Sequence, residues 1–226
     1  MGDAGVVSAT DLTATDRSTL RRKKERGSHE RAQVEAILDE GLVAHVALTD
    51  GRGPVVLPMV YARLGDRLYL HGALANHLLR TATGGAPVCV EVTLIDGLVL
   101  ARSAFHHSVN YRSVVLFGDA QLVDDLDEKR VAMVALVDHL VAGRSGGTRL
   151  PTDAELRTTA VVRVPIGEGS AKVRTGGPID DDEDLGLDVW AGVIPVATTF
   201  GRPEPDEGRP VELGVPDHVA VRVTPA

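Results

Sequence analysis

The chain has 226 residues, a single cysteine (Cys89) and a formal net charge of −8. This length suits one globular domain with its own apolar core, and one cysteine excludes both an internal disulfide framework and a cysteine-based zinc site. The negative charge argues against general nucleic-acid binding. No apolar run reaches the roughly 18 residues of a membrane-spanning helix, and the first residues do not resemble a signal peptide. We therefore expect a cytoplasmic protein that binds neither nucleic acid nor membrane.

The N-terminal region combines a polar segment with a basic one. Residues 1–18 are small and polar and are expected to form a flexible tail. Ser28 is a candidate cap for a helix over 29–40, which Gly41 ends. Seven basic residues gather near the start of this helix: Arg17, Arg21, Arg22, Lys23, Lys24, Arg26 and Arg31. We interpret them as a solvated arm that packs on an acidic surface, with binding of a phosphate or nucleic acid as the alternative.

Strand-like segments follow. Residues 42–49, 54–62 and 67–71 are rich in apolar residues and are separated by the turn sequences 50–53 and 63–66, which predicts an antiparallel meander. A short helix is expected over 74–83. Residues 87–94 alternate between apolar and other side chains, as in a half-buried strand. Asp96-Gly97 then predicts a turn into a strand over 98–101.

The second half contains further strands and two helices. A long strand is expected over 111–123, with Gly118 marking a bulge. The clearest helix covers 124–142, and Thr152 with Glu155 suits the capping box of a short one. Strands are expected over 159–168, 171–175 and 189–198. Residues 201–226 are rich in proline and predict an extended C-terminal tail.

Many short strands that do not alternate regularly with helices predict a mainly β fold. A doubly wound parallel sheet does not fit this order of elements. We expect an antiparallel β-barrel with peripheral helices over residues 19–200.

Two segments carry side chains suited to ligand binding. Residues 102–113 hold arginines, serines and histidines together with Asn110 and Tyr111, a set that can hydrogen-bond a phosphate and a polar ring edge. In residues 70–80 a strand ends and a helix begins, and helix N-termini bind anions. The alternatives are a solvated loop and a simple strand-to-helix connection.

Two other catalytic signatures are missing from the sequence. It contains no phosphate-binding glycine loop and no HExxH zinc motif. Cys89 lies within an expected strand and is interpreted as a core residue. Histidines leave a haem site open, with His71, His77 and His107 as candidate ligands.

Four segments together resemble the flavin-nucleotide-binding branch of the pyridoxamine 5′-phosphate oxidase-like proteins, which includes the nitroimidazole-resistance proteins. They are residues 68–72, 96–103, 107–113 and 190–195. The resemblance runs from about Thr19 to Gly201. It implies a split β-barrel homodimer with FMN at the dimer interface, or with FAD, a deazaflavin or haem as in some relatives.

The resemblance also implies which residues bind the cofactor. A strand would lie along the flavin ring, the end of another strand and the next helix would receive the phosphate, and two further segments would approach the ring. These residues are Val56, Leu57, Pro58 and Met59; His71, Gly72, Ala73, Asn76 and His77; Asn110, Tyr111, Arg112 and Ser113; and Trp190.

At the helix start, Ala75, Asn76 and His77 stand where the oxidase carries Ser-Arg-Lys. Phosphate binding would then depend on the helix N-terminus, His77, Arg80 or Arg112. Lys172 and Arg174 are candidates for an anionic substrate, with a surface ion pair as the alternative.

The function implied is a small flavin-dependent oxidoreductase that acts on a small-molecule substrate. No catalytic side chain is assigned, because the flavin supplies the redox chemistry. The alternatives are a non-catalytic module that binds haem or flavin, a protein like the nitroimidazole reductases, and an interaction dimer without ligand.

Overall fold

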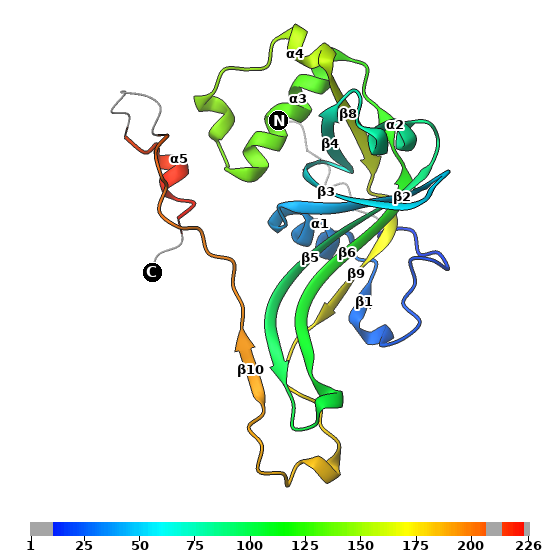
Figure 1. Cartoon of the computed structure of the whole chain (residues 1–226), viewed down its shortest axis with the longest axis vertical. Coiled ribbons are helices and arrows are strands. Elements are labelled where there is room, and N and C mark those ends of the chain that lie inside the picture. Colours follow the sequence, from blue (N-terminus) through cyan, green and yellow to red (C-terminus); the bar gives the residue numbers. More distant parts are fainter. Residues whose placement is uncertain (1–10, 207–213, 224–226) are drawn as a thin grey trace, which may run out of the picture.

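The computed structural model describes residues 11–206 and 214–223. Ten antiparallel strands form one sheet in the order β1-β9-β6-β5-β2-β3-β4-β8-β7, and β10 pairs with β5 (Figure 1). The strands are β1 Gly27–Ser28, β2 Val43–Asp50, β3 Gly53–Leu64, β4 Arg67–Ala73, β5 Pro87–Leu100, β6 Ser108–Asp119, β7 Gln121–Leu122, β8 Thr159–Pro165, β9 Glu168–Arg174 and β10 Gly192–Pro195. The helices are α1 Arg31–Glu40, α2 His77–Thr83, α3 Leu126–Leu140, α4 Asp153–Thr158 and α5 Asp217–Ala220. The prediction of a mainly antiparallel β fold with peripheral helices is confirmed.

The main core lies inside the curved sheet. Alternate residues of β2, β5 and β6 point inward, as the period of two requires, and are almost fully buried: Val46, Val88, Val90, Val92, Val114 and Leu116. Helix α1 packs against this core with Val34, Ile37 and Leu38. The buried Tyr61 hydroxyl donates a hydrogen bond of 2.6 Å to the Leu38 carbonyl, which fixes the end of α1 on β3.

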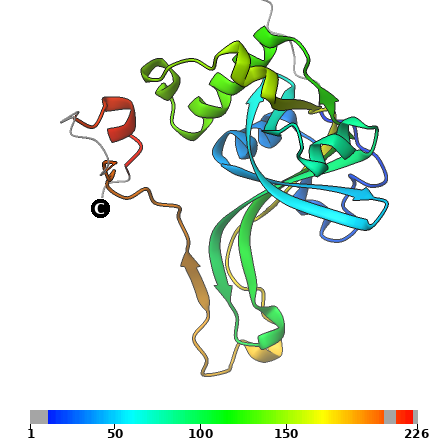
Figure 2. The same ribbon diagram turned by 45° about the horizontal axis from the view of Figure 1, so that its top comes forward.

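A second, smaller core lies between α3 and the strands β4 and β8. Tyr69, Val123, Ala132 and Val161 form it, and the view of Figure 2 shows the helical layer brought forward over the sheet. The buried Lys129 ammonium donates to the Leu156 and Thr159 carbonyls, which ties α3 to the end of α4. The predicted capping box of Thr152 and Glu155 is present at the start of α4.

An extension projects from the barrel where β5 and β6 run on together and β10 joins the edge of β5 (Figure 1). The predicted turn at Asp96-Gly97 is wrong, because β5 is continuous and its register shifts between Ile95 and Gly97. A β-carbon at Gly97 would lie 3.0 Å from Val193 Cγ1, so glycine allows β10 to approach. The bulge predicted at Gly118 is wrong as well, since Gly118 pairs with Val88 in register.

The ends of several elements differ from expectation. Ser28 does not cap a helix through its first turn: its hydroxyl accepts from the Glu30 N–H, and α1 begins at Arg31. Helix α2 begins only at His77, and the last long strand is limited to Gly192–Pro195.

Parts of both predicted tails have described structure. In residues 11–18, Leu12 is 3% exposed and Thr13 pairs with Glu168, so this segment packs on the sheet. The predicted C-terminal tail contains α5. Residues 1–10, 207–213 and 224–226 of these tails lie outside the described residues. Among the described helices, none has the length and apolar character needed to span a membrane.

Candidate functional site

The side of the sheet that faces away from the main core forms a continuous surface, here called the outer face. Cross-strand partners lie on the same side of a sheet, and the register joins His45 with Pro58 and Glu91, and Ser113 with Thr93 and Lys172. The outer face consists of Val43, His45, Val56, Pro58, Glu91, Thr93, Tyr111, Ser113 and Lys172. It combines exposed apolar surface with a few polar groups.

Charges of both signs meet on the outer face. His45 Nδ1 lies 3.3 Å from Glu91 Oε2, and the Thr93 hydroxyl donates to Glu91. The Lys172 ammonium lies 5.9 Å from the centre of the Tyr111 ring, within reach of a cation–π interaction. His45 and Glu91 were not predicted as site residues. Side chains alternate along β2 and β5, and both residues lie on the side of the sheet that faces away from the core. Lys172, expected at a substrate site, belongs to this surface.

The four residues of β3 that were predicted to bind the flavin, residues 56–59, alternate along the strand, so two lie on each side of the sheet. Val56 is 56% exposed and Pro58 is exposed, and both belong to the outer face. Leu57 and Met59 pair with Val46 and Ala44 on the opposite side, where Met59 packs against the main core. Only half of the predicted set can therefore present side chains to a ligand on the outer face.

Arg112 points away from Tyr111 and Ser113, as strand alternation requires. Its guanidinium donates to Asp96 at 2.8 and 3.0 Å and to Glu40 at 2.7 Å. These hydrogen bonds hold the pKa of the Glu40 carboxyl below its usual value. The three side chains line a cavity of about 560 Å³. Its lining also includes Val43, His45 and Thr93 of the outer face, and residues 196–198, Phe200 and Arg222. Two carboxylates thus compensate the cation that was expected to bind a phosphate.

Asn110 and Arg174 hold the base of the extension together. Asn110 is 8% exposed and donates from Nδ2 to the Gly176 carbonyl at 3.1 Å. Arg174, 5% exposed, donates to Asn110 Oδ1 and, at 3.0 Å, to the Gly177 carbonyl. Burial lowers the pKa of the Arg174 guanidinium. Arg174, predicted at a substrate site, therefore makes buried structural contacts.

The predicted phosphate cradle at the start of α2 contains a carboxylate. Asn76 caps the helix by accepting from the Leu79 N–H at 3.1 Å, and His77 Nε2 lies 2.6 Å from Asp50 Oδ2. His77 and then Arg52 hold the pKa of Asp50 far below its usual value. A β-carbon at Gly72 would lie 3.0 Å from Leu79, so glycine lets α2 approach β4. An anion at this helix start would meet the Asp50 charge.

His71 differs from the other histidines. It lies on β4 opposite Val161, on the same side of the strand as Tyr69 and hence toward α3. Its Nδ1 atom is buried and has no hydrogen-bond partner within the described ranges 11–206 and 214–223. Burial lowers the pKa of the imidazole, which keeps the ring neutral at neutral pH. A buried ring nitrogen without a partner is unusual and marks His71 as a candidate ligand.

Two other predicted residues lie apart from these groups. Trp190 precedes β10 in the extension and is 67% exposed, with its indole close to Gly192. His107 is exposed, and its Nδ1 lies 3.0 Å from the Ser103 carbonyl.

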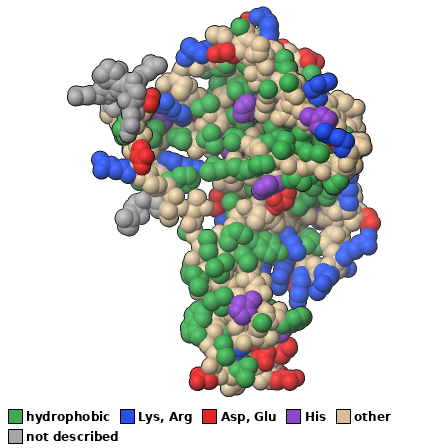
Figure 3. Space-filling view, in the orientation of Figure 1, with side chains coloured by type: hydrophobic (Ala, Val, Ile, Leu, Met, Phe, Trp, Pro, Cys, Tyr) green, Lys and Arg blue, Asp and Glu red, His purple; other side chains and the backbone are tan. Residues whose placement is uncertain are grey.

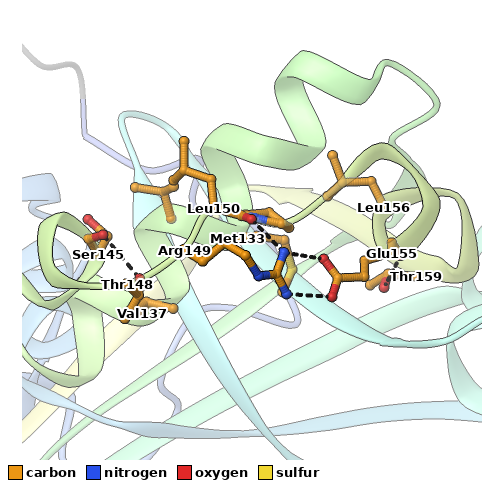
Figure 4. A pocket seen from close by; sticks show the side chains of 11 residues that line it. Met133, Val137, Ser145, Thr148, Arg149, Leu150, Glu155, Leu156 and Thr159 are labelled. Atoms are coloured by element: carbon orange, nitrogen blue, oxygen red, sulfur yellow. Dashed lines mark hydrogen bonds and ion pairs between the residues drawn. The ribbon is translucent and has the colours of Figure 1, made fainter.

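A further cavity, of about 280 Å³, lies between α3 and the segment that leads into α4 (Figure 4). Met133, Val137, Leu150 and Leu156 supply apolar walls, and the Arg149–Glu155 ion pair crosses it, with N–O distances of 2.7 and 2.9 Å. The sequence did not predict this cavity, because its lining combines residues of α3, α4 and the loop between them that share no local motif.

Comparisons with known proteins agree with this architecture. The family model described as pyridoxamine 5′-phosphate oxidase matches residues 30–173. The chain belongs to this family. A search of curated proteins found no match.

Two solved structures are similar along almost their whole length. The flavocytochrome Anf3 from Azotobacter vinelandii is 37% identical, with a TM-score of 0.86, over 92% of this chain and 96% of that one. The FAD and haem binding protein from Mycobacterium smegmatis is 36% identical, with a TM-score of 0.84, over 88% of this chain and 97% of that one. The split-barrel fold of the family is therefore confirmed.

The similarity to the nitroimidazole-resistance branch, which was predicted from sequence, is weaker than the similarity to these two structures. A putative 5-nitroimidazole antibiotic resistance protein from Bacteroides thetaiotaomicron is 24% identical, with a TM-score of 0.54, over 65% of this chain and 86% of that one. This likeness shows a shared fold only. The family assignment is confirmed, and the two flavocytochrome-type structures match better than the predicted branch.

Proposed function

We propose that this protein binds a flavin, FAD rather than the FMN expected from sequence, together with haem, and acts as a redox protein. The observation that carries the proposal is the near full-length similarity, at 36 and 37% identity, to an FAD and haem binding protein and to a flavocytochrome. The haem alternative considered at the sequence level therefore replaces the FMN oxidoreductase as the preferred function.

His71 on β4 has the properties of a haem iron ligand. An iron ligand must be a neutral imidazole with a free ring nitrogen, and His71 offers a buried Nδ1 without a partner within the described chain. The lowered pKa keeps the ring in its neutral form. His77 and His107 fit less well because both side chains are exposed in the single chain, and Asp50 also holds Nε2 of His77. His71 would therefore be the iron ligand.

The outer face fits the ring of a flavin. An isoalloxazine ring has a flat apolar face and a polar edge, and ligand sites commonly combine apolar walls with a few convergent polar groups. Val56 and Pro58 supply apolar surface, while Ser113 and Lys172 supply a hydroxyl and a cation nearby on the same face. Lys172 would orient the polar edge of the ring, and β3 would lie beneath it.

We also propose a homodimer. The outer face and the extension leave several large apolar side chains 42–56% exposed in the single chain: Val43, Val56, Ile95, Leu98 and Ile194. Surfaces of this kind on one sheet commonly mark protein interfaces. A second copy would cover them and enclose a ligand that one shallow face leaves open.

Bound flavin and haem would supply the electron transfer, and the chain would supply binding and orientation. His71 would bind the iron through a neutral ring nitrogen, and α3 would shield that side of β4 from water.

Cofactor loading tests the proposal. Purified protein is incubated separately with FAD, FMN and haemin, desalted, and examined by visible absorption. We expect retention of FAD in preference to FMN, and a haem spectrum with a shifted Soret band. In His71→Ala the Soret shift should be lost while FAD is retained; His77→Ala and His107→Ala are the matched controls.

Two results would overturn the proposal. A protein that retains no flavin at excess FAD does not have the proposed flavin site. A haem spectrum that is unchanged in His71→Ala removes His71 as the ligand. Light scattering of the loaded protein decides between the homodimer and a monomer.

A further inference from the structure

The far end of the extension brings together three potential metal ligands from separate parts of the chain. His106 ends the 3-10 turn Ala104–His106, while Asp181 and Asp184 flank and end the 3-10 turn Asp182–Asp184. One ligand atom from each of the three side chains lies within 4.8 Å of the other two. This group lies outside the outer face and the α2 region described above.

Local backbone geometry places the two carboxylates on one side. The Asp184 N–H donates to the Asp181 carbonyl at 2.9 Å, and residues three apart in a 3-10 turn project in the same direction. The opposite turn is fixed in the same way, because the His106 N–H donates to the Ser103 carbonyl at 3.1 Å. His106 therefore faces two carboxylates across the gap between the turns.

An ion pair holds the two segments at this distance. Arg102 donates to Asp180 from its backbone N–H and from Nη1, each at 2.9 Å, and the Asp180 side chain is 1% exposed. The cluster is thus built on a buried anchor. On this fixed backbone, rotation of the three side chains would bring their ligand atoms onto one ion.

The local charge is negative and largely uncompensated. Residues 180–184 are all acidic. Arg102 pairs with Asp180, but within the described part of the chain no lysine or arginine forms an ion pair with Asp181 or Asp184. Figure 3 shows acidic side chains gathered at this end of the extension. A cation would relieve the repulsion among these carboxylates.

We propose that His106, Asp181 and Asp184 bind a divalent transition metal ion such as Zn²⁺. One imidazole and two carboxylates suit such ions, with water completing the coordination. Two ligand atoms on one tetrahedral Zn²⁺ lie about 3.4 Å apart, so spacings of up to 4.8 Å would close by up to about 1.4 Å when the ion binds. The ion would replace the 3.1 Å contact between His106 Nε2 and Asp181. It would cross-link the two turns at the tip of the extension.

Metal titration of the full-length protein tests the site. After removal of metals by EDTA and desalting, Zn²⁺ is titrated by calorimetry, and Co²⁺ is used as a spectroscopic probe through its visible d–d bands. We expect about one Zn²⁺ per chain, with affinity falling at least about tenfold in His106→Ala and in Asp184→Asn. His107→Ala is the matched control, since it removes the adjacent exposed histidine and should leave binding unchanged.

Equal Zn²⁺ affinity in the wild type, His106→Ala and Asp184→Asn overturns the proposal, as does equal loss in His107→Ala or no binding at all. Circular dichroism checks that each variant is folded. The assay uses neither flavin nor haem, so its failure is distinct from failure of the proposed function.

Discussion

The barrel and the extension are parts of one sheet, but different interactions stabilise the two regions. In the barrel, inward residues such as Val90 and Leu116 are at most 1% exposed and pack into a continuous apolar core. In the extension, Leu98 and Ile194 remain 42 and 47% exposed, and arginines make the long-range contacts. Arg102 holds Asp180 there, and Arg174 holds Asn110 and two carbonyls. Apolar burial therefore dominates in the barrel, whereas in the extension charge-assisted hydrogen bonds add to strand pairing and to the burial of Val99 and Ala101.

Truncating one leucine in each region should give the largest difference. Leu116→Ala removes a side chain that is 0% exposed, and we expect a loss of about 2–5 kcal/mol in the free energy of unfolding. Leu98→Ala is the matched control on the neighbouring strand, and it should cost less than about 1 kcal/mol because Leu98 is already in contact with water. Urea unfolding at low protein concentration measures both.

Equal losses of unfolding free energy in the two variants would contradict the proposed difference between barrel and extension. A loss for Leu98→Ala that rises with protein concentration would instead show that a second copy covers the extension.

The second largest loss of stability is expected on substitution of the buried Arg174. Arg174→Met removes the hydrogen bonds to Asn110 Oδ1 and to the Gly176 and Gly177 carbonyls, and the buried Asn110 Oδ1 loses this donor. We expect a cost of about 1–3 kcal/mol and faster proteolysis within residues 176–191. Lys172→Met, two residues earlier on the outward side of β9, is the control. Faster cleavage in Lys172→Met than in Arg174→Met would contradict the assigned role of Arg174.

These contacts explain which features were predictable from sequence. The alternation of Val88, Val90 and Val92 predicts the barrel strand, because burial on one side of a strand has a period of two. The sequence Asp96-Gly97 fits a turn and an irregularity within a strand equally well, because glycine is common in both. The position of β10 beside Gly97 decides for the continuous strand.

The candidate site was predicted less well for a similar reason. Tyr111, Arg112 and Ser113 are adjacent in sequence, and a search for clusters groups them, but the strand places Arg112 on the opposite side. The carboxylates that hold Arg112 and His77 are distant in sequence: Glu40 lies 72 residues from Arg112, and Asp50 lies 27 residues from His77. A local motif contains no information about such partners, so cations held in ion pairs were interpreted as ligand-binding groups.

The smallest effect is expected where the two regions meet, at the pair of Glu40 on α1 and Arg112 on β6. Arg112 lowers the pKa of Glu40 in the folded state, so the folded state binds this proton less readily than the unfolded chain. The stabilisation is therefore fully present above the ordinary pKa near 4.5 and is lost as the pH falls through the lowered value. Both side chains are partly exposed, so we expect less than about 1 kcal/mol.

Glu40→Gln should accordingly be less stable than the wild type at pH 7, and the difference should shrink as the pH is lowered from about 4.5. Urea midpoints measured between pH 7 and about pH 3 test this window. Glu204→Gln is the control, because this exposed glutamate forms no ion pair with any described residue and should give a difference that is small at every pH. A Glu40→Gln cost that is independent of pH would mean that Glu40 acts through packing at the end of α1. The ionic contacts of Arg112 would then matter only through Asp96, within the strands β5 and β6 that continue from the barrel into the extension.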